Sequence, residues 1–156
     1  MDPNIVGMTL TPEQCRLVRL SVESLRDQAD PLSLLFYGKL FELDPSASRL
    51  FHHDLAQNGR KVIDTLAAVA DSLADFDAVR PRLARLGRQH AEYGVRPEQY
   101  EIAAAALLWA IAQTLGADFD PPMRQAWSLA VASVAGAMLD GAGPVDRSPL
   151  SGGRRA

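Results

Sequence analysis

One histidine, His90, lies among apolar residues on a predicted helix, where its imidazole could bind a metal ion or a cofactor. Spacings of four, three, four and three residues place five side chains on one face of this helix: Val79, Leu83, Leu86, His90 and Tyr93. A neutral imidazole that faces a core needs a polar partner, because an unpaired buried polar group is costly. That partner is a backbone carbonyl, another side chain or a metal ion.

The composition narrows the chemistry that His90 can perform. Catalytic zinc usually takes three protein ligands, and the histidines at 52, 53 and 90 form no zinc motif such as His-Glu-x-x-His. Cys15 is the only cysteine, so an internal disulfide and a cysteine-rich metal site are both excluded. Axial ligation of haem iron is one of the few roles that needs a single histidine. Two interpretations therefore stay open at this point: a structural histidine with a polar partner, or a haem ligand.

Length and composition place these residues in one domain. The chain has 156 residues, of which 47% are hydrophobic and 22% charged, and these values are ordinary for a protein with a sizeable core. The net charge of −3 provides no attraction to nucleic acid or anionic membranes. Residues 1–4 lack the features of a signal peptide, and the longest apolar run, 102–112, is too short to cross a bilayer. Together with the lone cysteine, these features predict a cytoplasmic protein.

Helix start and stop signals divide the chain into six long helices and at least one short one, with no strand signal. Thr11-Pro12 is a cap followed by a proline at the first helical position, and Asp30-Pro31 and Asp120-Pro121 repeat this signal. Gly94 and Gly116 stand where glycine commonly ends a helix. The long helices are expected at about 11–27, 30–44, 57–73, 77–93, 98–115 and 121–139, with a short turn at 45–51.

These signals predict an all-α fold with a folded part at 11–140. Residues 1–10 are expected to be a loose leader, and 141–156, where Gly, Pro, Ser and Arg dominate, a disordered tail. Residues 52–56 are expected to form a connector, and Asp77 to cap the His90 helix. Leu20 is among the expected core residues of the first helix.

Several short segments, taken in order, carry a more specific signal. They are Leu35-Phe36-Tyr37-Gly38-Lys39-Leu40-Phe41, Pro45 with Leu50-Phe51, Arg60-Lys61, Leu86-Gly87-Arg88-Gln89-His90, Tyr93-Gly94-Val95, Arg96-Pro97-Glu98-Gln99-Tyr100 and Ala126-Trp127. Their order and spacing resemble a bacterial single-domain globin, similar both to the globin module of flavohaemoglobins and to the single-domain haemoglobins of thermoacidophilic methanotrophs. The resemblance implies a globin fold of six to eight helices around a pocket for haem b, iron protoporphyrin IX.

The resemblance also implies roles for individual residues. His90 matches the proximal histidine that binds iron, and Phe51 matches the phenylalanine that packs flat on the porphyrin. Tyr37 matches a distal tyrosine whose hydroxyl donates a hydrogen bond to iron-bound dioxygen. Val62 would lie over the iron, and Val95 would belong to the apolar wall of the pocket. For Phe51 and Tyr37 the alternative is ordinary core packing.

Two polar positions are less defined. Counting 32 residues back from His90 places the second distal residue at Asn58, where the family more often has Gln or His, with Gln57 as the neighbouring choice. Asn58 would reach the gas through Tyr37 or a water, and a helix cap is its alternative role. Lys61 matches a basic residue that pairs with a haem propionate, and a solvated lysine is the alternative.

The chain departs from flavohaemoglobins on the proximal side. Tyr100 matches their proximal tyrosine, but the partner glutamate falls near Ala142, with Asp140 as the candidate substitute. We also expect that this chain does not include a reductase domain. The expected function is reversible binding of dioxygen and other diatomic gases by a monomer or weak homodimer. Nitric oxide dioxygenation or peroxidase-like turnover with an external reductase is the first alternative, and a haem-free helical regulator is the second.

Overall fold

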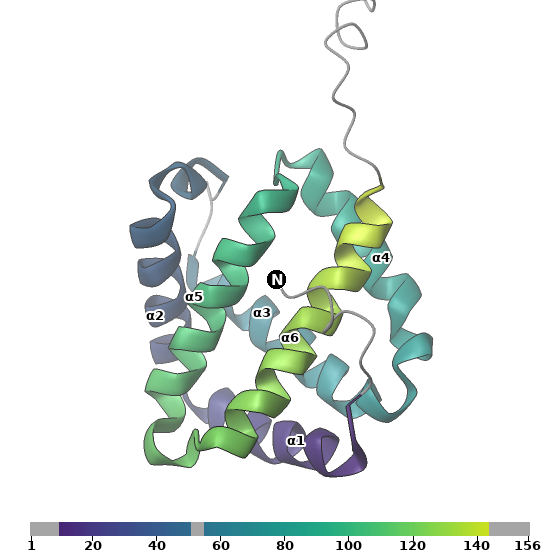
Figure 1. Ribbon diagram of the computed structural model, residues 1–156. Helices are drawn as coiled ribbons and strands as arrows, with labels where there is room; N and C mark the ends of the chain where they lie inside the picture. Colours follow the sequence, from purple (N-terminus) through teal and green to yellow (C-terminus); the bar gives the residue numbers. More distant parts are fainter. Residues whose placement is uncertain (1–9, 51–54, 144–156) are drawn as a thin grey trace, which may run out of the picture.

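Six α-helices form the part of the chain that the structure describes (Figure 1), which is residues 10–50 and 55–143, without the side chains of 55–58. In this computed structural model they are α1 (Pro12–Asp27), α2 (Ala29–Leu43), α3 (Leu55–Ser72), α4 (Phe76–Glu92), α5 (Pro97–Leu115) and α6 (Pro121–Ala142). The 3₁₀ turns η1 (Pro45–Leu50), η2 (Leu73–Asp75) and η3 (Gly116–Asp118) join some of them. No strand occurs among these residues, and the all-α prediction is confirmed.

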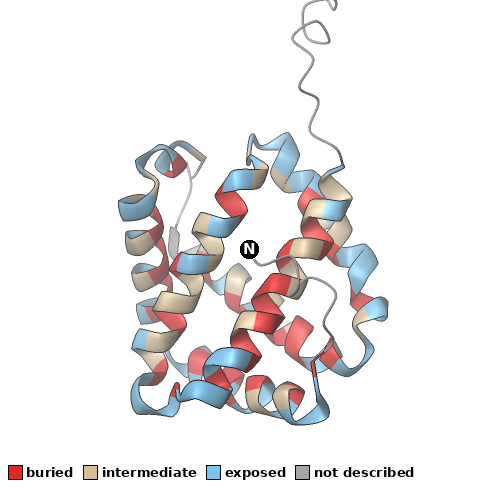
Figure 2. Ribbon diagram, in the orientation of Figure 1, coloured by how far each residue is buried: buried red, intermediate tan, exposed pale blue. Residues whose placement is uncertain are grey.

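The helices pack in crossed pairs around one core. α5 and α6 lie in front in Figure 1, α3 passes behind them and α1 runs across the base. α4 packs mainly on α6, and α2 packs on both α5 and α3. Figure 2 shows that exposed residues gather on the outward sides of these helices, while buried ones face the interior. Trp127 of α6 is buried against α1, where its Nε1 donates to Ser21 Oγ at 2.8 Å.

Three of the predicted helix ends are confirmed by their hydrogen bonds and backbone angles. Thr11 Oγ1 accepts from the Gln14 N–H at 3.1 Å while Gln14 Oε1 accepts from the Thr11 N–H at 2.9 Å, which is a capping box. Asp120 Oδ1 accepts from the Met123 N–H at 3.1 Å. Gly94, which follows α4, has a φ of 98°, a left-handed conformation that glycine adopts without strain.

The predicted caps Asp30 and Asp77 are wrong. α1 and α2 abut at Gln28, whose N–H donates to the end of α1 while its carbonyl accepts from Leu32 N–H at 2.9 Å. Asp30 therefore lies inside α2, and its carboxylate pairs with Arg60 at 3.7 Å. Asp77 lies in the first turn of α4 because η2 occupies the residues before it, and Asp77 pairs with Arg80 at 3.5 Å.

Two predicted helix limits also shift. α3 begins at Leu55, so residues 55 and 56 belong to the helix and not to the expected connector. α6 continues to Ala142 because Gly141 packs directly on the α4 backbone at Ala84, which holds the last turn in place. The predicted leader and the rest of the predicted tail, at 1–9 and 144–156, lie outside the described residues, as do His52 and His53.

Two residues expected on apolar faces are exposed instead. Tyr93 is 77% exposed because it is the C-cap of α4, where the helical spacing no longer sets the direction of the side chain. Leu20 is 57% exposed, since the buried face of α1 runs through Cys15, Val18, Val22 and Leu25. Amphipathic spacing therefore located the apolar faces correctly, but not every residue on them.

Among the described residues, one helix is long and apolar enough to cross a membrane by length and composition. It extends over Pro97–Asp118, has a mean hydropathy of 1.3 and is 28% buried. It is longer than the run 102–112 considered above because Pro97 starts α5 and the helical turn continues into η3. A core helix passes the same test, and α5 packs on α2 and α6.

Glycine allows α4 and α6 to approach closely. A Cβ on Gly87 of α4 would overlap the backbone carbonyl of Met138 of α6. Gly87 is buried and lies about one turn before His90 in the same helix. The close contact therefore helps to set the position of the part of α4 that carries His90.

Replacing Gly87 by alanine should lower the free energy of unfolding by about 1–3 kcal/mol, because overpacking forces the two backbones apart. Gly38 of α2 provides a matched control, since a Cβ there meets nothing within 4 Å. Gly38→Ala should raise the free energy of unfolding by about 0.5–1 kcal/mol through helix propensity alone. Urea denaturation measures both, and equal effects of the two variants would contradict the close-packing argument.

Candidate functional site

The imidazole of His90 is held by the helix that carries it. His90 is half-buried on α4, and its Nδ1 lies 2.8 Å from the carbonyl oxygen of Leu86, one turn earlier. A carbonyl oxygen only accepts, so the hydrogen bond requires that Nδ1 carries the proton. The neutral ring then has its lone pair on Nε2, the nitrogen that remains available to a metal.

This bond bears on both interpretations of His90. It provides the polar partner that a structural histidine needs, and it is also the contact that orients a ligating one. Among the described residues, no group of three or more His, Cys, Asp or Glu side chains could hold a metal ion. The described residues therefore provide a single imidazole as a metal ligand, which suits a cofactor that supplies the other ligands of its metal.

The side chain of Tyr37 is buried beside two other aromatic rings. It lies on α2, is 4% exposed, and its ring centroid is 4.9 Å from that of Phe36 and 6.0 Å from that of Phe41. Burial raises the pKa of Tyr37 to about 12. The hydroxyl therefore keeps its proton at neutral pH and can act as a hydrogen-bond donor.

Tyr100 lies on the other side of the site, beside His90. The two ring centroids are 6.5 Å apart, with an interplanar angle of 49°. Tyr100 Oη is buried and has no hydrogen-bond partner within the described part of the chain, and burial raises its pKa. Asp140, the candidate carboxylate, is exposed on α6 and makes no bond to this hydroxyl. The described residues thus form no tyrosine–carboxylate pair next to His90.

The structure describes the other predicted site residues to different degrees. Val62 and Val95 are half-buried and pack against the core cluster that contains Tyr37 and Tyr100. Lys61 is exposed on α3 and has no ion pair within the ranges described. The remaining assignments fall on residues that are not described, or only in their backbone: Phe51, Gln57 and Asn58.

The start of α3 decides one of the two roles predicted for Asn58. The helix starts at Leu55, so Asn58 is its fourth residue, beyond the cap position. The helix-cap alternative for Asn58 is therefore wrong. Its role as the second distal residue stays a prediction, as does that of Gln57.

A polar link that sequence analysis missed joins the two turns on either side of the site. Gln99 of α5 is buried, and its Nε2 donates to Asp44 Oδ2 at 3.0 Å while its Oε1 accepts from Arg96 N–H at 2.8 Å. Asp44 also accepts from Ser46, at 2.6 Å from the hydroxyl. The start of η1 is thereby tied to the start of α5. Gln99 resembles Gln14 as a capping residue, but nothing local indicates a partner 55 residues away.

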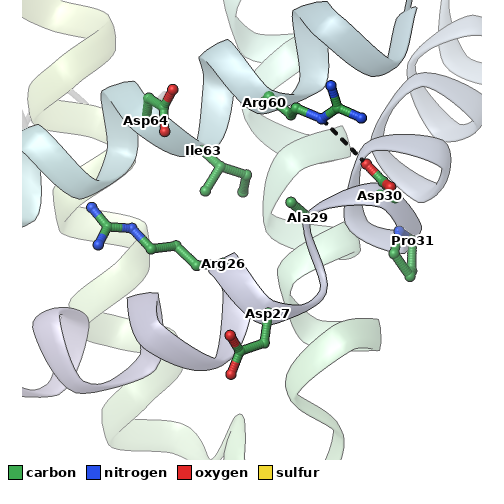
Figure 3. Close-up of a pocket in the computed structure, with 8 residues that line it drawn as sticks. All are labelled: Arg26, Asp27, Ala29, Asp30, Pro31, Arg60, Ile63 and Asp64. Carbon is green, nitrogen blue, oxygen red and sulfur yellow. Dashed lines mark ion pairs between the residues drawn. The ribbon is translucent and has the colours of Figure 1, made fainter.

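Two cavities can be described among the residues that the structure describes. One of about 440 Å³ lies between the α1–α2 junction and α3, and Figure 3 shows that charged side chains dominate its wall. It is lined by Arg26, Asp27, Ala29, Asp30, Pro31, Arg60, Ile63 and Asp64, none of which is a predicted site residue. The other, of about 190 Å³, lies between α3 and α4 and includes Leu86, whose carbonyl bonds His90. Only the second cavity adjoins the candidate site.

An all-α protein with one oriented imidazole beside a core containing two buried tyrosines is typical of a helical haem protein. A sequence model of the globin family, described as Globin, matches residues 34–138 of the chain. This match covers more than half of the sequence. The protein belongs to the globin family, and the expected globin fold is confirmed.

Individual relatives support this assignment. Neuroglobin-1 of Oncorhynchus mykiss is 27% identical over 146 residues, which are 85% of this chain and 92% of that protein. A flavohemoprotein of Deinococcus radiodurans is 30% identical over 133 residues, or 83% of this chain. These residues make up 33% of the flavohemoprotein, so the similarity is to one part of a longer protein.

Solved structures give the same result. An engineered carbene transferase, made from a Rhodothermus marinus protein assigned as a nitric oxide dioxygenase, is 31% identical with a TM-score of 0.71. The alignment covers 81% of this chain and 89% of that one. A bacterial globin from Campylobacter jejuni shares the fold at 23% identity, with a TM-score of 0.74 and coverage of 85% and 96%. The predicted resemblance to bacterial globins and to the flavohaemoglobin globin module is confirmed.

The link between Asp44 and Gln99 should make stability depend on pH. Hydrogen bonds from Ser46 and Gln99 hold the pKa of Asp44 below its ordinary value of 3.8. A lowered pKa in the folded state means that this stabilisation is complete above the ordinary value and is lost as the pH falls through the folded one. Asp44→Asn should therefore reduce the free energy of unfolding at pH 7. At pH values below both the folded and the unfolded pKa of Asp44, this reduction should disappear.

Urea denaturation across this pH range measures the difference between Asp44→Asn and the unchanged protein. Asp118→Asn, which removes an exposed carboxylate of η3, is the control for the loss of one negative charge. A difference between Asp44→Asn and the unchanged protein that did not vary with pH would contradict the argument.

Proposed function

We propose that this globin binds haem with His90 Nε2 as the iron ligand and reversibly takes up dioxygen and other diatomic gases. The observation that carries the proposal is the 2.8 Å contact between His90 Nδ1 and the Leu86 carbonyl. That contact selects the tautomer whose Nε2 is free, and it limits rotation of the ring. Bound haem supplies a redox-active iron at which such gases bind.

The residues around His90 fit an apolar, tightly enclosed group. Leu86 and Val95 are half-buried beside the histidine, and Leu107 and Leu108 of α5 pack against the same core cluster. Such residues exclude water from the iron-facing side and retain a flat apolar ring system by burying its surface. Exposed Lys61 is available for a propionate, as the family resemblance implies.

Haem b is the form that fits the chain. Covalent attachment of haem in c-type proteins uses a Cys-x-x-Cys-His motif. Here the single cysteine, Cys15, is buried on α1, in a different helix from His90. We therefore expect non-covalent binding of iron protoporphyrin IX. The cytoplasmic location and the monomeric or weakly dimeric state stay predictions.

Tyr37 is the residue that we expect to hold the gas. Its protonated hydroxyl can donate to an acceptor inside the core, and a hydrogen bond there is strengthened by the low local dielectric. Release of the gas would then require this bond to break. Phe51 on the porphyrin face, Val62 over the iron and Asn58 as the second distal residue complete the proposed site.

Nitric oxide dioxygenation with an external reductase is the second candidate. It is favoured by the 31% identity to the Rhodothermus marinus protein and by the similarity to the flavohemoprotein. The Tyr100 hydroxyl is the reason to rank this enzymatic function second. Within the described residues, no carboxylate reaches that hydroxyl to increase electron donation by His90. Sustained consumption of nitric oxide by the reduced protein, with reductant supplied, would reverse this ranking.

Replacing His90 by alanine should abolish stable haem binding, because His90 is the only histidine among the described residues. The purified protein should show an intense Soret band and His90→Ala should lose it. Glu92→Ala, an exposed neighbour on α4, is the control and should keep the band. Full haem occupancy in His90→Ala would overturn the assignment, and an unchanged protein that takes up no added hemin would overturn the haem function itself.

Removing the Tyr37 hydroxyl should speed release of dioxygen by roughly tenfold, which corresponds to one lost hydrogen bond of about 1.4 kcal/mol. Tyr100→Phe removes a hydroxyl that has no hydrogen-bond partner among the described residues, and it should leave the release rate almost unchanged. Stopped-flow displacement of dioxygen by carbon monoxide measures both rates. Equal rates in Tyr37→Phe and the unchanged protein would show that Tyr37 has only a packing role.

A further inference from the structure

The outer face of α4 carries a strip of exposed side chains that the proposed gas-binding function does not use. Spacings of three and four residues place Arg82, Arg85 and Gln89 along one side of the helix, and Tyr93, the C-cap residue, follows them at the end of α4. All four are exposed, and Tyr93 is 77% exposed. We refer to these four residues as the α4 strip.

The charge of the α4 strip is not neutralised by neighbouring carboxylates. Five other arginines form ion pairs with carboxylates close to them: Arg16, Arg26, Arg60, Arg80 and Arg96. Within residues 10–50 and 55–143, Arg82 and Arg85 form none, and neither does Arg88 beside them. Glu92 is close in sequence but pairs with no arginine there. A chain with a net charge of −3 thus presents a local positive surface on α4.

The α4 strip also lies directly over the segment that holds the proposed iron ligand. Arg82, Arg85 and Gln89 line the cavity of about 190 Å³ between α3 and α4 together with Leu86. The Leu86 carbonyl in turn bonds His90 Nδ1 at 2.8 Å. A protein bound to the strip would therefore lie next to the turn of α4 that carries His90.

We propose that the α4 strip is a docking surface for an acidic one-electron carrier protein that reduces the haem iron. This inference rests on the proposed haem function and deepens it. Tyrosine and arginine are the residues that contribute most at protein interfaces, and a positive patch selects a negative partner. Redox partners bind through small surfaces, so a few charges suffice. In the transfer the carrier loses one electron and the ferric iron gains it, with no bond made or broken.

The test uses the haem-loaded protein and an acidic [2Fe–2S] ferredoxin as the probe. Calorimetry at low ionic strength should show binding that weakens as salt is added. Arg82→Glu combined with Arg85→Glu should weaken binding about tenfold and slow reduction of the ferric protein by the ferredoxin to a similar extent. Tyr93→Ala should also weaken binding, and its effect should persist at higher salt because the contact is largely apolar.

The matched control reverses the same number of charges elsewhere. Arg19→Glu with Arg124→Glu changes exposed arginines of α1 and α6 and should alter binding by less than about twofold. If this control weakens binding as much as the α4 variant, the attraction is only that of net charge and the proposal fails. It also fails if the unchanged protein does not bind ferredoxin, or binds a single-stranded RNA oligomer in its place.

Two further observations keep this test independent of folding and of haem uptake. Should the double variant lose haem, the single variant Arg82→Glu takes its place and should weaken binding by a smaller but measurable factor. If the unchanged protein shows a normal Soret band but does not bind ferredoxin, the docking surface is rejected and the haem function is not. A missing Soret band in the unchanged protein would reject the proposed function instead.

Discussion

The hydrogen bond from His90 Nδ1 to the Leu86 carbonyl is the interaction on which the site depends. It spans one turn of α4, so it exists only while that turn remains helical, and Gly94 ends the helix directly afterwards. The position of this helical turn is set by α6, whose backbone packs against Gly87 without an intervening side chain. Orientation of one imidazole is therefore coupled to the close contact between α4 and α6.

Two buried tyrosines show how the same side chain can contribute different chemistry on the two sides of such a site. Tyr37 lies among aromatic rings, and burial keeps its hydroxyl protonated and able to donate. Tyr100 lies beside His90, where a partner for its hydroxyl would alter the electron donation of the ring, but no described residue provides one. Under the proposed function, this asymmetry favours holding a gas over activating it. α4 adds a second asymmetry, since its inner face carries the histidine and its outer face carries arginines that form no ion pair within the described residues.

Local signals were enough to predict the helices. Caps and glycines act within four residues, so Thr11, Asp120 and Gly94 could be recognised from their neighbours alone. The predictions failed where a neighbouring element changed the outcome: Asp30 lost its cap role because α1 runs directly into α2 at Gln28. The resemblance to globins, which depends on the order of short segments, was likewise available from the sequence and is confirmed by the family match.

The sequence by itself determined that this protein is an all-α globin with one histidine, His90, on an apolar helix face, because periodicity and spacing are properties of the chain. Only the tertiary structure decided which side-chain hydrogen bonds form between separate segments of the chain. The tie between Asp44 and Gln99 joins residues 55 positions apart, and the lone hydroxyl of Tyr100 reflects a partner that the last helix does not supply. Such contacts depend on where separate helices meet, and no pattern within either segment specifies that meeting point.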